Sequence, residues 1–242
     1  MAKTLYDYWF VQFDFPDANG KPYKTSGGKM VYNETLKREI PEGWEAKELG
    51  ELISYERGIS YKSSEIVDEG IPMINLNSFD LLGKHKVSGI KFFSGQYKAN
   101  KVVQPNDLVI AITDVTRNAD IIGRAFTIPK IYERDILISC DVAKVVPTDN
   151  IDKYFLEQLF NSNDYHRYIK HFATGTLVLH LNLNGVSWCK IPKPPKELLD
   201  KFSGFRAEAV AKITQAQKEN TKLIELRDWL LPMLMNGQVT VK

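Results

Sequence analysis

The chain has 242 residues, of which 43% are hydrophobic, so it is long enough for one sizeable core with an appendage. Its formal net charge of +2 excludes a general basic field for nucleic acid, so any anion-binding surface must be local. The two widely separated cysteines exclude a disulfide framework, and no apolar run has the length of a signal peptide core or a membrane span, so we expect a soluble, cytoplasmic protein without membrane association.

Residues 1–43 form an N-terminal arm with an unusual density of aromatic side chains. The tract YDYWFVQFDFP (6–16) is followed by the turn signals PDANG (16–20) and SGG (26–28). This pattern predicts short strands or extended chain that must lie against an apolar surface. That surface is either the protein's own core or a partner subunit.

Residues 44–194 are predicted to form a globular domain whose first half is a short helix followed by strands. The segment WEAKELGEL (44–52) predicts a short opening helix. Runs rich in Ile and Val, bounded by Gly, Pro, Asn and Asp, then predict strands. These runs are 71–76, 107–113, 121–128 and 136–146.

The second half of this domain mixes helices with one more strand. Residues 151–160 and 162–172 predict two helices, and Ser162 is a plausible N-cap for the second. The segment TLVLHLNLNG (176–185) alternates strictly, which predicts a strand with Leu177 and the three following alternate leucines on one face. The predicted fold class is α+β (mixed α/β), with a mixed sheet.

Residues 195–242 are predicted to form one long helix and a short tail. Pro195 suits a first helical turn, and Pro232 followed by Asn236-Gly237 suits an end. Apolar residues recur at spacings of three and four, which predicts a coiled-coil seam about 55 Å long, with Asn220 at a seam position where it would fix register or partner number. A helix of this length exceeds a small domain, so its distal part needs another helix. The expected helix interface comprises Phe202, Phe205, Ile213, Asn220 and Leu223.

Catalytic and metal-binding patterns are missing from the sequence. SGGK (26–29) lacks the glycine spacing and the following Ser or Thr of a phosphate loop, and no dinucleotide-binding or nucleophile-elbow motif occurs. The four histidines do not have metal-ligand spacing. We therefore expect no covalent chemistry, no metal and no cofactor in this chain.

Several polar loops could contact nucleic acid. Between residues 80 and 101, five lysines alternate with aromatic and amide side chains, although a solvated loop would have the same composition. The segment DVTRNAD (114–120) puts Arg117 beside Asn118 between two apolar runs. Arg can bind guanine and Asn can bind adenine with two hydrogen bonds, but a plain polar hairpin tip would look alike.

The order of several segments resembles a known family. These are YDYWFVQFDFPDANGKPYKTSGG (6–28), IPEGWE (40–45), DLVIAITD (107–114), ATGTLVLHLNLNGVSWCKIPKPPKEL (173–198) and LRDWLLPMLMNGQVTV (226–241). Together they cover nearly the whole chain. The chain resembles the DNA-specificity (S) subunit of type I restriction–modification systems.

The resemblance implies a function without catalysis. A target recognition domain would read one half of a split double-stranded DNA sequence, and the long helix would set the gap to the other half. The subunit would recruit methyltransferase subunits, which bind S-adenosylmethionine, and through them restriction subunits that use ATP and Mg²⁺. The residues expected to contact DNA are Lys62, Asn75, Asn77, Lys84, Lys86, Arg117, Asn118, Thr174 and Thr176.

The sequence departs from this family in having one recognition domain and one long helix instead of two. It is therefore expected to be a natural half-subunit or the C-terminal half of a longer one. A half-subunit would pair through its helix with a second copy, or with another specificity half. The alternative functions are a coiled-coil adaptor without specific DNA binding and, least favoured, an enzyme of unknown class.

Overall fold

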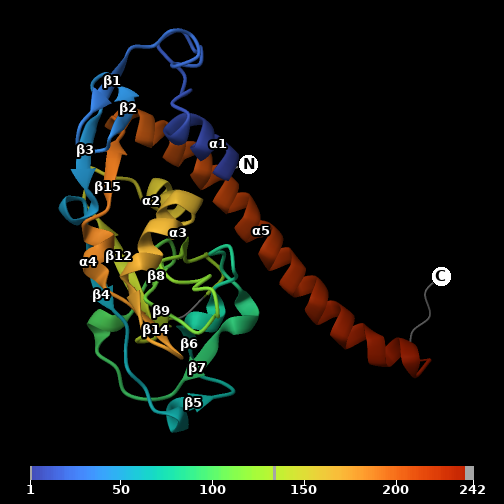
Figure 1. Ribbon diagram of the computed structural model, residues 1–242. Helices are drawn as coiled ribbons and strands as arrows, with labels where there is room; N and C mark the ends of the chain where they lie inside the picture. The colour runs from blue at the N-terminus through green and yellow to red at the C-terminus, as the bar shows by residue number, and fades with distance from the viewer. Residues whose placement is uncertain (1, 133–134, 238–242) are drawn as a thin grey trace.

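The computed structural model describes residues 2–132 and 135–237 and consists of a mixed α/β body and one long helix, α5 (Lys196–Met235), that extends far beyond the body (Figure 1). The predicted fold class is confirmed. Met1 and residues 238–242, including part of the tail predicted for 195–242, lie outside the described residues. None of the helices in the described part combines the length and apolar composition of a membrane-spanning segment.

The N-terminal arm packs on the protein's own core. It comprises α1 (Ala2–Tyr6), a π-helical turn η1 (Asp7–Val11) and a hairpin of β1 (Met30–Asn33) with β2 (Arg38–Pro41). The prediction of strands or extended chain was wrong for the first part of the tract 6–16, which is helical to Val11. Tyr6, Phe10 and Phe13 are buried in the main core cluster, and their spacing of four and three suits a helical face better than a strand.

Two four-stranded sheets form the centre of the body. The first is antiparallel, with the order β10 (Ala125–Thr127), β8 (Leu108–Ala111), β12 (Val142–Pro147) and β4 (Ile53–Arg57). All four residues of β8 are buried, as expected for a central strand with an unbroken apolar run.

The second sheet is mixed. Its order is β11 (Leu137–Ile138), β6 (Ile71–Ile74), β7 (Lys91–Phe93) and β5 (Ile66–Val67), and β11 runs parallel to β6. The run predicted as one strand at 136–146 is therefore two strands, β11 and β12, that belong to different sheets.

The helix predicted at 44–52 was wrong. Glu45–Glu48 form strand β3, which pairs with β15 (Lys190–Lys193), and only Leu49–Glu51 turn as a 3-10 helix, η2. The partner strand lies more than 140 residues away in the sequence, so its pairing overrides a local helical preference.

The alternating segment 176–185 is a strand only in its centre. A three-stranded sheet contains β13 (Ala173–Thr174), β14 (Leu179–Leu181) and β9 (Thr113–Asp114), and a short helix, α4 (Leu183–Ser187), follows. The prediction that Leu177 and Leu183 share one face of a strand was wrong. Leu177 lies in an exposed turn, and Leu183 is helical because Asn182 caps α4.

The predicted helices of the second half are confirmed. They are α2 (Lys153–Phe160) and α3 (Asn163–Ile169), with Asp152 and Ser162 accepting hydrogen bonds as their N-caps. Single 3-10 turns occur at η3 (Ser63–Glu65), η4 (Leu76–Ser78), η5 (Val87–Gly89), η6 (Ala99–Lys101) and η7 (Lys170–Phe172).

Helix α5 has 40 residues and is therefore about 60 Å long. Pro195 is its N-cap residue. The prediction that Pro232 helps to end the helix was wrong, because the helix continues through it to Met235. Asn236 then caps the end, and Gly237 has the left-handed backbone conformation (φ +69°) that commonly follows a helix.

Candidate nucleic-acid interface

The loop between β9 and β10 holds a fixed shape around one buried carboxylate. Asp114 is fully buried, and its Oδ1 accepts a hydrogen bond from the Thr116 backbone N–H at 2.6 Å. Its Oδ2 accepts from the backbone N–H groups of Ile121 (2.6 Å) and Ile122 (2.7 Å). Thr116 Oγ1 in turn accepts from the Asp120 N–H at 2.7 Å. A buried charge bonded to three donors orders this loop before any ligand arrives.

Arg117 and Asn118 are exposed on this ordered loop, as the sequence analysis predicted for a DNA contact. The Nζ of Lys170 donates to the Asn118 backbone carbonyl at 2.7 Å. Lys170 begins the 3-10 turn that leads into β13, so this bond joins the Arg117 loop to the β13–β14 turn. Thr174, the last residue of β13, and Thr176 in the turn are both exposed, and β14 pairs directly with β9. The structure thus brings two of the predicted loops together.

Arg124 connects the same region to a third loop. Its side chain is buried, and it donates through Nε to the Asp120 carbonyl (3.3 Å) and through Nη1 to the Asn161 carbonyl (2.8 Å). Its Nη2 lies 3.1 Å from Nδ1 of His166. Burial lowers the pKa of Arg124, and burial together with the Arg124 charge lowers the pKa of His166 to about 4. His166 is therefore neutral near pH 7 and can accept the hydrogen bond.

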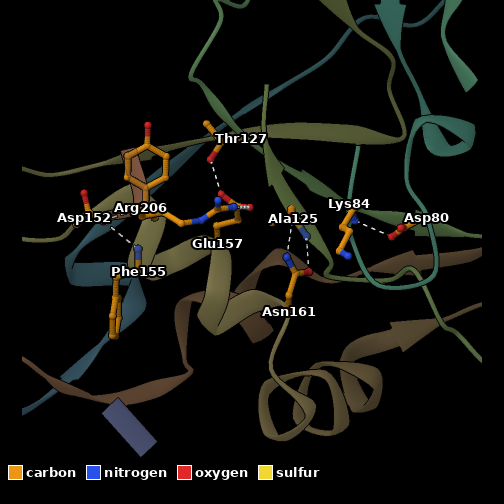
Figure 2. Close-up of polar contacts among 10 residues, drawn as sticks. Asp80, Lys84, Ala125, Thr127, Asp152, Phe155, Glu157, Asn161 and Arg206 are labelled. Atoms are coloured by element: carbon orange, nitrogen blue, oxygen red, sulfur yellow. Dashed lines mark hydrogen bonds and ion pairs between the residues drawn. The ribbon is translucent and has the colours of Figure 1, made fainter. Parts of the chain in front are cut away.

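The third loop contains the exposed residues Lys84 and Lys86. Asp80 Oδ1 accepts from the backbone N–H of Lys84 at 2.7 Å, which closes the turn (Figure 2). Gly83 packs so closely on Asn161 that a β-carbon there would meet its Oδ1 at 2.1 Å. The loop is thereby fixed to the Arg124 network, on the same support as the Arg117 loop.

The side chain of His85 attaches this lysine loop to the body of the domain. Its Nε2 lies 2.8 Å from the Tyr132 hydroxyl, and its ring packs against Phe126 with centroids 5.0 Å apart. Burial lowers the pKa of His85 to about 4, so the ring is neutral near pH 7. His85 therefore supports the loop and does not add to its charge.

The expectation for Asn75 is corrected by its surroundings. Asn75 is 3% exposed, and its amide donates to the carbonyls of Met73 and Gly89 while its oxygen accepts from the Asn77 N–H. It caps the turn and does not project into solvent. Asn77 itself is exposed.

The other lysines singled out from the sequence differ in their exposure and hydrogen-bond partners. Lys62 is exposed beside η3, where its backbone N–H donates to Glu65. Lys91 donates to the Tyr61 hydroxyl and Lys101 to the Arg57 carbonyl, so both are partly buried and occupied. The lysine-rich segment is thus not a uniform basic strip.

Helix α5 is attached to this body by a buried ion pair. Arg206 Nη2 lies 2.8 Å from Glu157 Oε1, and both side chains are almost buried. The other carboxylate oxygen of Glu157 accepts from Thr127 Oγ1 at 2.7 Å (Figure 2). At Asn161, the residue that caps the end of α2, the side chain exchanges two hydrogen bonds with the Ala125 backbone. The start of α5 and strand β10 are therefore both held by the last turn of α2 and its cap.

The expectation that Phe202 belongs to a helix interface is corrected. Phe202 is 0% exposed, and its ring meets that of Phe10 edge-on with centroids 5.2 Å apart. It is therefore core. The other expected interface residues are exposed, namely Phe205, Ile213, Asn220 and Leu223.

A groove of about 670 Å³ lies between the N-terminal arm and the start of α3. Its lining includes Lys3, Asp7, Arg38 and Asp164, so both charge signs are present. Within the described residues, no group of three or more His, Cys, Asp and Glu side chains could hold a metal ion.

Asp114 and Arg124 are the residues that sequence reasoning missed. Asp114 stands next to the polar segment of Arg117 and Asn118, and Asp followed two residues later by Thr is a local turn signal that could have found it. Arg124 stands inside an apolar run that predicted a strand, and nothing local indicated its partners. Both residues shape the loops and leave Arg117 and Asn118 exposed.

The known proteins to which this chain is similar belong to one class. The chain is 28% identical over 251 aligned residues to the type I restriction enzyme MjaIX specificity subunit of Methanocaldococcus jannaschii, covering 100% of this chain and 53% of that protein. It is 25% identical to the HindI specificity subunit of Haemophilus influenzae, over 83% of this chain and 42% of the relative. The chain thus spans about half the length of the curated relatives it matches.

The fold is also found in a solved structure of the same class. The type I restriction–modification S subunit from M. genitalium aligns with a TM-score of 0.50 and 14% identity, over 78% of this chain and 43% of that one. No family model matches the sequence. The resemblance to type I specificity subunits stated from the sequence is confirmed.

Proposed function

We propose that this chain recognises a DNA sequence as part of a type I restriction–modification complex. The observation that carries the proposal is the similarity to the MjaIX specificity subunit along the whole chain. The three ordered loops support it, because they present exposed Lys, Arg, Asn and Thr side chains on one shared network. These are side chains that contact phosphates and base edges.

Different loops would make different kinds of contact with the DNA. Lys84 and Lys86 would neutralise phosphates and so position the duplex, with Lys62 as a more distant contact. Arg117 and Asn118 would read bases in one half-site, with Asn77, Thr174 and Thr176 beside them. The order imposed by Asp114 means that little loop entropy is lost when DNA binds.

The long helix would hold this reading surface at a set distance from a second one. Its attached half is fixed to the body, while its distal half carries exposed apolar residues that suit a second helix. The partner would be a second copy or another specificity half. The complex would recruit methyltransferase subunits that bind S-adenosylmethionine and, through them, restriction subunits that use ATP and Mg²⁺. This chain would contribute no catalytic group.

The test is selection of bound duplexes from a random pool by the purified chain at about 0.2 M salt, where nonspecific phosphate binding is weak. A shared motif among the selected duplexes is the expected result. Arg117→Ala should relax the preference at one base pair, whereas Lys84→Ala should weaken all sequences alike and reduce the salt slope by about one.

The contrary result would be retention of DNA only at low salt and without any shared motif. The exposed distal stripe of α5 would then favour the second candidate, a coiled-coil adaptor that binds proteins and not specific DNA.

A further inference from the structure

One apolar side chain projects from the middle of the polar loops. Leu177 is 88% exposed, more than any other large hydrophobic residue in the part of the chain that the structure describes. It stands in the turn between β13 and β14, directly after Thr176. A single exposed leucine is ordinary, so its neighbours decide whether it has a role.

The turn between β13 and β14 depends on the backbone conformation of a glycine. Gly175 has φ +133°, a conformation that side-chain-bearing residues rarely adopt, and a β-carbon there would meet the Val178 carbonyl oxygen at 2.1 Å. Glycine is therefore required for the tight return of the chain at this point. The turn lifts Leu177 clear of the sheet, although its sequence alternation would have allowed a buried strand.

Two further apolar side chains stand beside Leu177. Leu179 of β14 is paired with Asp114 of β9, so the next positions outward are Val178 and Val115. Val178 is 40% exposed and Val115 is 60% exposed. We call Val115, Leu177 and Val178 the apolar ridge.

Two cationic residues near the ridge favour an anionic partner. Arg117 follows Val115 by two residues and is exposed, and Lys170 bridges the two loops. The carboxylate of Asp114 beneath the ridge faces inward and is fully bonded. An apolar patch of three side chains inside a polar and cationic rim is small for a protein–protein contact.

We propose that the apolar ridge contacts the C5-methyl groups of thymines in the major groove. This methyl group is the apolar feature that a base pair presents there, and it distinguishes A·T from G·C without a hydrogen bond. The inference rests on the proposed function and deepens it, because it makes Leu177 a specificity-determining residue beside Arg117 and Asn118. The half-site read by this chain would then include at least one thymine next to the bases read by Arg117.

The test combines a protein change with a DNA change. With the duplex selected by the wild-type chain, Leu177→Ala should weaken binding about tenfold, as expected for loss of about three apolar carbons from a partly desolvated contact. Replacing one thymine by uracil, which removes only the methyl group, should weaken the wild type about threefold and the Leu177→Ala variant hardly at all. The salt slope should not change, because no phosphate contact is lost.

Controls separate this inference from the proposed function. Val31→Ala, at an exposed apolar residue in strand β1 of the N-terminal arm, should bind like the wild type. If the wild type selects no motif, the proposed function fails and the ridge with it. If it selects a motif but uracil substitution is silent at every thymine, or weakens the variant as much as the wild type, only the ridge contact is overturned.

Discussion

The two halves of helix α5 share the same spacing of apolar residues, but these residues are buried in one half and exposed in the other. In the attached half, Leu198, Leu199 and Phe202 are buried, and Arg206 forms an ion pair that is almost buried. In the distal half, Leu223 and Trp229 are about 60% exposed. The apolar spacing of threes and fours runs through both halves, yet within the described residues only the first half buries its large apolar side chains.

The difference shows what a helical repeat specifies and what it leaves open. The repeat determines that a stripe exists on one face, but the neighbouring elements determine what covers it. The body covers the first half with α1, η1 and α2. In the part of the chain that the structure describes, the large apolar side chains of the distal half stay exposed, which is why pairing with another helix is part of the proposed function.

Truncation of the buried ring should have the largest effect. Phe202→Ala is expected to lower the free energy of unfolding by about 4 kcal/mol, because it leaves a cavity among aromatic side chains that cannot close fully. Urea titration followed by tryptophan fluorescence measures this. Phe205→Ala, three residues further and exposed, is the matched control and should cost less than about 1 kcal/mol. Equal losses would remove the contrast between core and surface on this helix.

Neutralising one member of the buried ion pair should come next. Glu157→Gln is expected to cost about 3 kcal/mol, since it leaves the Arg206 charge uncompensated where water is excluded. The exposed pair Arg227–Asp228 in the distal half is the comparison. Asp228→Asn should leave the urea midpoint unchanged. If both substitutions were silent, the ion pair would not be what fixes the helix to the body.

Acid should weaken the body more than the distal half. Burial lowers the pKa of His85 to about 4 in the folded state, against about 6.5 when unfolded, so the unfolded state binds a proton first. Stability is therefore fully present above pH 6.5 and should fall by on the order of 2 kcal/mol between pH 6.5 and 4. Urea midpoints across this range, compared with His85→Gln, measure the effect.

The His85→Gln variant should show a flatter pH profile than the wild type. The distal half of α5 contains no histidine, so its stability should not follow that profile. An identical pH dependence for variant and wild type would exclude His85 as the cause.

A charge on the distal stripe should have the smallest effect on unfolding. Leu223→Glu is expected to change the free energy of unfolding of a single chain by less than about 0.5 kcal/mol, because this side chain is 62% exposed. Its effect should appear in association. Sedimentation at micromolar concentration should show a dimer for the wild type and a monomer for the variant.

Ala211→Glu provides the control, because it adds the same charge on the face of α5 away from the stripe. It should sediment like the wild type. A wild-type monomer at these concentrations would contradict pairing with a second copy.

Sequence reasoning predicted the parts of the fold whose signals are local. The helices α2, α3 and α5 follow from apolar periodicity and from capping residues such as Ser162. It was wrong at 44–52 and 176–185, where a distant partner strand and a glycine turn decide the conformation. At the candidate site it located the loop of Arg117 and Asn118 but not Arg124, whose partners come from the α2–α3 connection.

Because Asp114 fixes the conformation of its loop, that conformation does not depend on which side chains the outer positions of the loop carry. Asp114 and Thr116 close the loop through backbone N–H groups, and Lys170 and Arg124 hold it through backbone carbonyls of Asn118 and Asp120. Positions 115, 117 and 118 contribute no side chain to this closure. They therefore form a cassette that could be randomised in a library, and selection for new target sequences could proceed there without redesigning the scaffold.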